Sequence, residues 1–344
     1  MPELGKLSVA MIGFGRIAKR HITAIQALSD RLELVAICDV DETRLNAFGD
    51  DLGIAPRYSD LDAMLDAEAP DVLHIGTPPA HRFDLLAAAV SHGVGGVIVE
   101  KPIAMQGEDY DRIRRLPLAG TKVCVNHQLH FHHRVREMRA AVAGGVIGEV
   151  RLVEVTATLG LSGQGTHALQ LASAFAGGAA PTSVFGQVGG GGWLDDSHPC
   201  PEASVAVVSL ADGTQIHMQC GTNGPALRPD NPTHLNKRVA AYGTRGLAEW
   251  TMSSWELHIG EAATSGVHEY YAADLPGQVG LTEAMFDWLE DGATGHPTNL
   301  SDSLTQFNVI LGLYMSALER RPVDLPVEPD AGLLGKLRAR LEGA

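Results

Sequence analysis

The sequence predicts an α/β protein with an N-terminal parallel-sheet domain and a C-terminal α+β domain whose open sheet is mainly antiparallel. Up to about Cys124, short runs rich in Val and Ile alternate with stretches of helical period, which is typical of βαβ units. After Ile147, strand-like segments follow one another directly, with Gly-containing turns between them. A length of 344 residues suits two domains. We expect a dinucleotide-binding domain over residues 1–125 and a substrate-binding and oligomerisation domain over 126–344.

The predicted elements of the first domain are mainly apolar strands, as expected for a sheet covered by helices on both faces. The strands are expected at residues 7–13, 32–39, 71–77, 95–101 and 121–126. The helices are expected near 16–28, 42–53, 59–69, 80–93 and 132–145, with Ser59 as the N-cap of the third. In the second domain, strands are expected within 148–159, 204–220 and 238–252, and helices at 281–292 and 301–321.

Composition excludes several classes of partner. The formal charge of −15, from 26 Lys and Arg against 41 Asp and Glu, opposes general attraction to nucleic acid or to anionic membrane surfaces. No apolar stretch approaches the roughly 20 residues that cross a bilayer, and the N-terminus lacks the layout of a signal peptide. The four cysteines are widely spaced and contain no Cys-x-x-Cys pair. We therefore expect a cytoplasmic protein with reduced thiols.

The segment from Gly13 to Ala18 occupies the place of a dinucleotide fingerprint, since it ends the first strand and begins the first helix. Gly13 permits the tight turn, Gly15 leaves room for backbone to approach a pyrophosphate, and the small Ala18 allows the helix to pack closely on the strand. The N-terminus of the helix offers N–H groups and a positive dipole end to the phosphates. This pattern predicts a Rossmann domain that binds a dinucleotide.

Asp39 supports the same interpretation, because it ends the second strand at about the expected separation from the glycines. A carboxylate at this place accepts hydrogen bonds from both ribose hydroxyls and repels a 2′-phosphate, which favours NAD over NADP. Arg44, in the next helix, could instead reach a 2′-phosphate. The alternative for Asp39 is a solvated residue at a strand end.

Three further strand ends carry polar residues at the edge of the sheet where ligands of parallel α/β proteins bind. They are Thr77-Pro78-Pro79 with His81, Glu100-Lys101-Pro102, and Asn126-His127-Gln128. Thr77 and the prolines would form a rigid wall against the nicotinamide half of the cofactor, although Pro78 and Pro79 could also simply end a strand. The residues expected at the cofactor are Gly13, Phe14, Gly15, Arg16, Ile17, Asp39, Thr77, Pro78, His81, Glu100 and Lys101.

These motifs, taken together, resemble the Gfo/Idh/MocA family of sugar and polyol oxidoreductases. The resemblance rests on GFGRIA at 13–18, TPPAH at 77–81, VEKPIA at 99–104, the segment 125–150 and the closing pattern from 283 to 326. Glu-Lys-Pro is the most specific of these. The resemblance implies an NAD(P)-dependent dehydrogenase or reductase acting on CH–OH groups, with a Rossmann domain and a second domain whose open sheet often forms the oligomer interface.

The resemblance assigns Lys101 to the reacting hydroxyl or carbonyl oxygen of the substrate. An ammonium held beside that oxygen stabilises developing alkoxide charge, and a strand end holds it rigidly. The alternative is a surface lysine, although Lys101 stands between an apolar strand and a proline. Glu100 would then anchor either the ribose or the lysine by a charge-assisted contact.

The family also carries an Asp-x-Gly-x-His-x-x-Asp pattern early in its second domain, whose histidine exchanges the substrate proton. Here His167 is retained, but Gly163 and Gln170 stand at the places of the two aspartates. The resemblance therefore implies an altered substrate pocket, in which Gln164 could supply a neutral contact. The alternative for His167 is a packed histidine at a helix start. The residues expected at the substrate are Lys101, Asn126, His127, Gln164 and His167.

A metal site is the alternative for the histidine cluster His127, His130, His132 and His133. The cluster has no nearby Cys or paired acid, and its family counterpart lines the substrate pocket without a metal. We expect no metal ligands.

The leading hypothesis is reversible hydride transfer between NAD and a secondary alcohol or ketone of a sugar, sugar derivative or inositol, with Lys101 and His167 as an acid/base pair. An NAD-retaining redox step that assists glycoside cleavage is one alternative, which the altered pocket keeps open. A non-catalytic dinucleotide-binding sensor is another. The family resemblance also implies a homodimer or homotetramer.

Overall fold

The computed structural model describes residues 6–228, 230, 232–292, 295–328 and 330–342. These residues form two compact units. The first comprises Met1–Ala104, Arg112–Gln128 and Leu275–Asp302, and the second comprises Met105–Asp111, Leu129–Asp274 and Ser303–Ala344. Each unit is therefore built from three segments of the chain that are separated in sequence.

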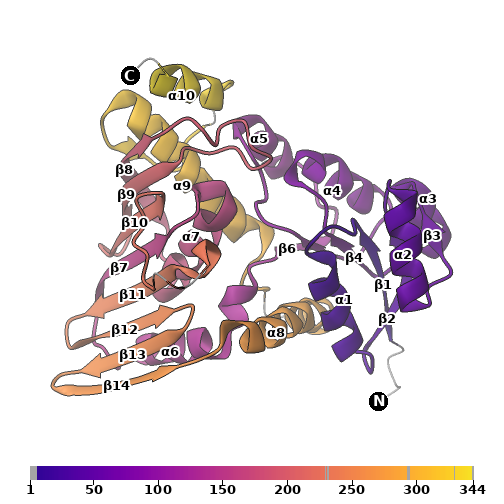
Figure 1. The fold of residues 1–344 in the computed structure, drawn as a ribbon, viewed down its shortest axis with the longest axis horizontal. Helices are drawn as coiled ribbons and strands as arrows, with labels where there is room; N and C mark the ends of the chain where they lie inside the picture. Colours follow the sequence, from indigo (N-terminus) through magenta and orange to yellow (C-terminus); the bar gives the residue numbers. More distant parts are fainter. Residues whose placement is uncertain (1–5, 229, 231, 293–294, 329, 343–344) are drawn as a thin grey trace. The chain divides into compact units, whose positions relative to one another are not determined.

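The first unit contains a six-stranded parallel sheet in the order β3-β2-β1-β4-β5-β6. Figure 1 shows this sheet with its helices, in indigo and violet. The strands are β1 (Leu7–Ile12), β2 (Leu32–Cys38), β3 (Arg57–Tyr58), β4 (Val72–Ile75), β5 (Gly96–Val99) and β6 (Lys122–Val125). The helices are α1 (Ala18–Ala27), α2 (Glu42–Leu52), α3 (Leu61–Glu68), the 3-10 turn η1 (Pro79–His81) and α4 (Arg82–Ser91). The order reverses between β1 and β4, which is the switch point where such sheets bind ligands.

The core of this sheet explains why these strands form where they do. Apolar side chains of β1, β4 and β5 are almost fully buried, including Met11, Leu73 and Val97, since helices cover both faces. The predicted parallel-sheet domain is thereby confirmed.

The second unit contains a nine-stranded sheet in the order β14-β13-β12-β11-β7-β10-β9-β8-β15. Its strands are β7 (Val150–Ala157), β8 (Pro181–Gly189), β9 (Ala203–Leu210), β10 (Gln215–Gly221), β11 (Lys237–Gly243), β12 (Gly246–Thr251), β13 (Ser254–Ile259), β14 (Ala262–Val267) and β15 (Val323–Asp324). Every pair is antiparallel except β7 with β10. The predicted open, mainly antiparallel sheet is confirmed.

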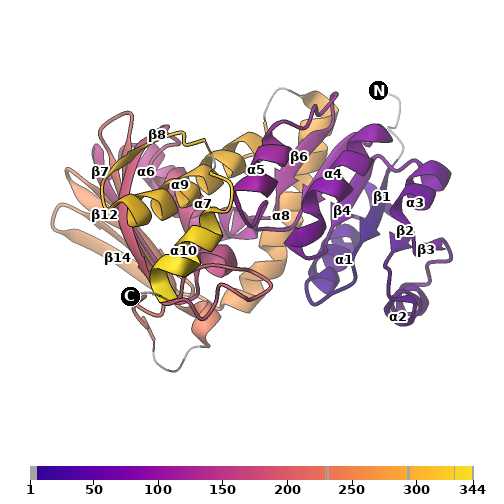
Figure 2. The same ribbon diagram turned by 90° about the horizontal axis from the view of Figure 1, so that it is seen from above.

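Helices cover one face of this sheet, as the turned view in Figure 2 shows for α7 and α9. They are α6 (His133–Ala143), α7 (Thr166–Phe175) and α9 (Leu300–Glu319), whose residues from Ser303 onward belong to this unit. Burial alternates along the strands accordingly: in β10, Ile216, Met218 and Cys220 are buried, whereas Gln215, His217 and Gln219 are more exposed. The remaining elements are α5 (Gly107–Arg114), η2 (Gln128–Phe131), the π-helical turn η3 (Leu161–Gly165), η4 (Thr233–Leu235), α8 (Tyr270–Asp291) and α10 (Leu333–Glu342).

Local detail differs from the sequence prediction at one helix cap. The N-cap of α3 is Asp60, whose carboxylate accepts a hydrogen bond from the Ala63 backbone N–H at 2.9 Å. The prediction of Ser59 was wrong by one residue, because both side chains can cap and only the start of the helix decides which does. The prediction also missed the short β3, the strands β8, β13 and β14, and the helices α5 and α10.

Candidate active site

The turn between β1 and α1 can hold only glycine at its first position. Gly13 has φ of +91°, and a Cβ there would lie 2.8 Å from the backbone N of Thr77 and 2.9 Å from the carbonyl carbon of Gly76. The turn thus packs directly against the end of β4. Both the left-handed conformation and the lack of space explain the first glycine of the fingerprint.

The residues after this turn fit a dinucleotide. Gly15 is exposed, and a Cβ there would meet no atom of the described chain within 4 Å, so a pyrophosphate could approach the backbone. Among the described residues, no side chain caps the first turn of α1, which leaves its N-terminus to an anion. Arg16 is exposed beside it, and Ile17 is the N-cap residue. In the neighbouring strand end, the buried hydroxyl oxygen of Thr77 lacks a partner within the described chain.

Asp39 lies at the end of β2 and is only 5% exposed. Its Oδ2 accepts a hydrogen bond from the Phe14 backbone N–H at 2.7 Å, and its Oδ1 accepts one from the Asp41 N–H at 2.9 Å. Nε of Arg44 lies 3.2 Å from Oδ2. Asp39 therefore holds the glycine turn in place, with Arg44 directed at the same carboxylate.

Glu100 and Lys101 follow β5 at the same edge of the sheet. The Glu100 carboxylate accepts hydrogen bonds from Nε2 of His21, at 3.0 Å, and from the Asn126 amide. Burial by itself raises the pKa of Glu100, but these hydrogen bonds and the positive charge of Lys101 lower it to about 2. Burial lowers the pKa of Lys101; the Glu100 charge opposes this, while nearby arginines add to it. The site thus holds an ionised carboxylate next to a lysine whose pKa is lowered.

The other residues predicted at this edge differ in exposure. His81, at the end of η1, and Pro78 are exposed. Asn126 is 1% exposed, and its Nδ2 also donates to Oε1 of Gln278 at 3.1 Å. His127 is 3% exposed, and burial together with the Lys101 charge lowers its pKa to about 3, so it is neutral at physiological pH.

Sequence reasoning missed His21, His74 and Gln278, which complete the surroundings of Glu100. His21 lies on the buried face of α1 with Ile22 and Ile25, and His74 lies in the apolar strand β4. A histidine within an apolar stripe is the signal that could have drawn attention to both. Gln278 has no such signal, since it comes from α8, far along the chain.

The second unit contains the segment around His167. His167 is in the first turn of α7 and is 4% exposed. Gln164 lies in η3, and its Oε1 has no hydrogen-bond partner among the described residues. A Cβ at Gly163 would meet nothing nearer than Leu159 Cβ at 4.0 Å, so packing does not require glycine there. Lys101 belongs to the first unit and His167 to the second.

Gln170, which stands at the position of the family's second aspartate, contacts the ring of His130. Its amide lies 2.5 Å from Nδ1 of His130, whose Nε2 accepts a hydrogen bond from Arg139 Nη1 at 2.5 Å. A neutral imidazole has one donor and one acceptor, so Nδ1 of His130 must donate. The Gln170 Oε1 atom, otherwise unpartnered within the described chain, is therefore the acceptor, and the amide is turned accordingly.

The histidine cluster shows no metal geometry. Within the ranges that the structure describes, no three His, Cys, Asp or Glu side chains are grouped so as to hold a metal ion. His132 instead contacts the rings of Trp250 and His268. In the same ranges, no helix is both long and apolar enough to span a membrane.

Comparison with known proteins finds sequence relatives of the N-terminal part of the chain. Residues 7–133 match the model of the Gfo/Idh/MocA family, described as an oxidoreductase family with an NAD-binding Rossmann fold. D-apiose dehydrogenase of Paraburkholderia graminis is 34% identical over 141 residues, 40% of this chain and 37% of that protein. D-glucoside 3-dehydrogenase of Escherichia coli is 32% identical over 148 residues, 42% of this chain and 41% of that protein. The matched stretch thus spans about two fifths of these relatives.

Solved structures extend the likeness of fold to nearly the whole chain. An oxidoreductase from Agrobacterium radiobacter, solved with NAD⁺, L-tartaric acid and magnesium, has a TM-score of 0.79 at 20% identity and covers 93% of this chain and 98% of its own. The WlbA dehydrogenase of Bordetella pertussis, solved with NADH and UDP-GlcNAcA, has a TM-score of 0.74 at 21% identity, covering 94% and 99%. The strand order, the glycine turn and the Glu-Lys-Pro edge agree with the match of residues 7–133 to the NAD-binding Rossmann fold of the Gfo/Idh/MocA oxidoreductase family.

Proposed function

We propose that the protein is an NAD-dependent dehydrogenase that transfers hydride between the nicotinamide and a secondary alcohol or ketone of a sugar, sugar derivative or inositol. The observation that carries the proposal is Lys101, held at a strand end beside an ionised Glu100, with its pKa lowered by burial. A relative from Thermotoga maritima, 27% identical over 152 residues, is named myo-inositol 2-dehydrogenase, and the relatives above are named for D-apiose and D-glucosides. These names support a polyol substrate.

The proposed roles follow from the chemistry of alcohol oxidation. NAD⁺, held by the glycine turn and Asp39, would supply the acceptor for the hydride of the carbinol carbon. The hydroxyl proton must leave at the same time, so that alcohol and NAD⁺ become ketone, NADH and a proton. Lys101 donates a hydrogen bond to the substrate oxygen and stabilises its developing negative charge. His167 accepts the hydroxyl proton in oxidation and returns it in reduction.

The cofactor preference is assigned to the turn around Asp39. A carboxylate at this place accepts hydrogen bonds from ribose hydroxyls and repels a 2′-phosphate. Arg44 lies against this carboxylate, which partly offsets that repulsion. We propose NAD as the preferred cofactor, with tighter binding of NADH than of NADPH in a fluorescence titration as its test.

The test of the activity is NADH formation with NAD⁺ and a panel of inositols, aldoses and glycosides. Lys101→Ala should lower kcat/KM by about 10²- to 10⁴-fold, the usual contribution of such a group. Lys6→Gln, at an exposed lysine before β1, is the matched control and should retain full activity. Release of aglycone without net NADH formation would contradict the dehydrogenase activity and support NAD-retaining glycoside cleavage. Tight NADH binding without any turnover would favour a sensor.

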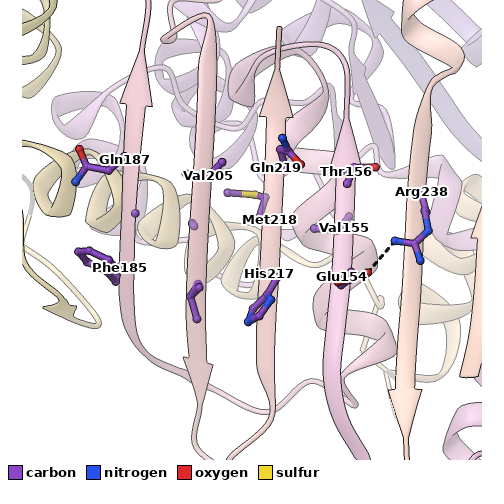
Figure 3. A pocket seen from close by; sticks show the side chains of 13 residues that line it. Glu154, Val155, Thr156, Phe185, Gln187, Val205, His217, Met218, Gln219 and Arg238 are labelled. Atoms are coloured by element: carbon purple, nitrogen blue, oxygen red, sulfur yellow. Dashed lines mark hydrogen bonds and ion pairs between the residues drawn. The ribbon is translucent and has the colours of Figure 1, made fainter. Parts of the chain in front are cut away.

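We also propose that the open face of the nine-stranded sheet joins copies of this chain into a dimer or tetramer. This face carries a shallow groove of about 500 Å³. In Figure 3, Phe185, Val205 and His217 project from adjacent strands, and Arg238 forms an ion pair with Glu154 at 3.0 Å. Phe185 and Val205, on the neighbouring strands β8 and β9, are 45% and 41% exposed, and exposed apolar side chains close together on one sheet face favour association.

The oligomer is tested by light scattering of the wild type and of Phe185→Lys with Val205→Lys. The double variant should shift the mass to that of one chain, because two cations would be buried in the interface. Val40→Lys, at an apolar residue 84% exposed in the first unit, is the control and should leave the mass unchanged. If the wild-type protein has the mass of a single chain, the oligomer proposal is contradicted, whereas the proposed activity is unaffected.

A further inference from the structure

A buried chain of hydrogen-bonded polar side chains includes Glu100 of the Glu-Lys-Pro segment. Its two histidines, His21 and His74, have no role in the proposed chemistry. His21 of α1 and His74 of β4 are both 0% exposed, and their Nδ1 atoms lie 3.0 Å apart. Nε2 of His21 lies 3.0 Å from Oε1 of Glu100, which is 7% exposed. The Asn126 amide donates to the same Oε1. Three segments distant in sequence therefore meet at one carboxylate, and a fourth is joined to it through His21.

The hydrogen-bond roles in this chain can be deduced. A carboxylate only accepts, so Nε2 of His21 carries a proton and donates to Glu100. Of the two Nδ1 atoms, one must donate and the other accept. Burial lowers the pKa of His74 well below its ordinary value, so His74 is neutral and holds a single proton.

The unpartnered nitrogen of His74 decides between the two arrangements. Its Nε2 is buried and has no hydrogen-bond partner within the described part of the chain. A proton on this atom would leave a buried N–H unsatisfied, which costs more than an unprotonated nitrogen in the same place. The proton of His74 is therefore on Nδ1 and is donated to Nδ1 of His21. His21 is left as the neutral tautomer with its proton on Nε2.

We propose that His21 is a positioning residue, which fixes the Glu100 carboxylate in its ionised form and thereby sets the charge that faces Lys101. The proposal stands on the 3.0 Å contacts on either side of His21 and on the burial of its partners. Its consequence for turnover rests on the proposed role of Lys101, whereas its consequence for the charge of Lys101 does not.

Glu100 and three arginines shift the pKa of Lys101 in opposite directions. Arg16, Arg20 and Arg82 all lower the pKa of Lys101, whereas Glu100 raises it. His127, also facing Lys101, is neutral near pH 7, since its own pKa is about 3. If Glu100 lost the donor from His21 and took up a proton, Lys101 would lose the one counter-charge in this set. Its pKa would then fall further.

Two polar substitutions test separately the hydrogen bond of His21 to Glu100 and its hydrogen bond to His74. In His21→Gln the amide reaches the place of Nε2 and retains a donor for Glu100. In His21→Asn the shorter amide reaches only the place of Nδ1 and retains a partner for His74. Both fill the site with a polar group, so a purely structural role would give similar results for the two.

The measurement is competitive labelling of the amine with acetic anhydride over a pH series, with the Lys101 peptide quantified by mass spectrometry. We expect the midpoint for Lys101 to fall by about one pH unit in His21→Asn, which makes labelling well below the midpoint about tenfold faster. His21→Gln should keep the wild-type midpoint. Where a substrate has been found, kcat/KM should fall about tenfold in His21→Asn with unchanged NADH affinity.

His296→Gln is the matched control, since His296 is 1% exposed in the same unit but bonds Leu281 O and the Thr298 backbone instead of Glu100. It should leave the Lys101 midpoint unchanged. Equal midpoints in His21→Asn and His21→Gln, or an equal fall in His296→Gln, would overturn the positioning role. A protein that turns over no polyol would refute the proposed function, yet the labelling result would still decide the role of His21.

Discussion

The predicted site residues lie in two regions that are constrained very differently. At the carboxyl edge of the Rossmann sheet, Gly13 has no room for a side chain, and Glu100 is held by donors from α1 and from the end of β6. In the second unit, a Cβ at Gly163 would meet nothing nearer than Leu159 Cβ at 4.0 Å, and Gln170 contacts His130. The first region agrees with the family motifs, and the second departs from them. The region that retains the family motifs is thus the one whose residues are held by steric contacts and hydrogen bonds.

The largest expected effect is the loss of the Glu100 carboxylate. Glu100→Ala would leave the His21 N–H and the Asn126 amide buried without their acceptor, which should lower the free energy of unfolding by about 3 kcal/mol. Urea denaturation measures it. Glu149→Ala, at an exposed carboxylate paired with Arg151, is the control and should stay within about 0.5 kcal/mol of wild type. Equal losses in the two variants would remove the distinction between the regions.

The two glycines test the same contrast directly. Gly13→Ala should cost about 2–3 kcal/mol of stability, because it combines a left-handed φ with contacts of 2.8 Å to Thr77. It should also weaken NADH binding more than tenfold. Gly163→Ala should change stability by less than about 0.5 kcal/mol, since its Cβ has space. Thermal unfolding and a fluorescence titration of NADH check both, and a Gly163→Ala protein as unstable as Gly13→Ala would contradict the contrast.

Buried histidines extend the comparison to pH. His132 is 1% exposed among rings and cations, and burial, aided by His268 and His133, lowers its pKa from an ordinary 6.5 to about 3. The folded state therefore binds fewer protons than the unfolded chain between these values. The resulting stability is complete above pH 6.5 and is lost as the pH falls toward 3.

His132→Phe keeps the ring and removes the titration. The loss of unfolding free energy between pH 6.5 and 4 should become smaller by about 2 kcal/mol, which discounts the full shift for partial solvation. Denaturation at several pH values measures the slope. Part of the slope should persist, because His268, with a pKa lowered to about 4, titrates in the same direction. An unchanged slope would show that this cluster does not govern acid stability.

The smallest expected effect concerns a carboxylate at the surface. Asp60→Ala removes the N-cap of α3 and should cost about 1 kcal/mol, whereas Ser59→Ala should cost less than about 0.3 kcal/mol. Thermal unfolding compares the two. The reverse order would restore the original Ser59 prediction and place the helix start one residue earlier.

Much of the fold could be predicted because its signals are local. The five main strands of the first sheet and the glycine turn follow from short-range patterns, since burial on both faces demands apolar runs and a tight turn demands Gly13. The short β3 and the hairpin β13–β14 lack such patterns. None of the residues of Ser254–Ile259 and Ala262–Val267 is buried, so hydrophobic periodicity could not reveal these strands.

The sequence by itself determined the class of fold, the dinucleotide fingerprint and the position of Lys101, because each depends on residues adjacent in the chain. Only the tertiary structure decided which side chains form hydrogen bonds with Glu100, the residue next to that lysine. His21 and Glu100 are 79 residues apart, and Asn126 and Gln278 are 152 apart, yet all belong to one buried hydrogen-bond chain. Such pairings depend on which segments the sheet order brings together, and no local periodicity records that. Burial then removes water as an alternative partner, so each polar group depends on the one the fold supplies.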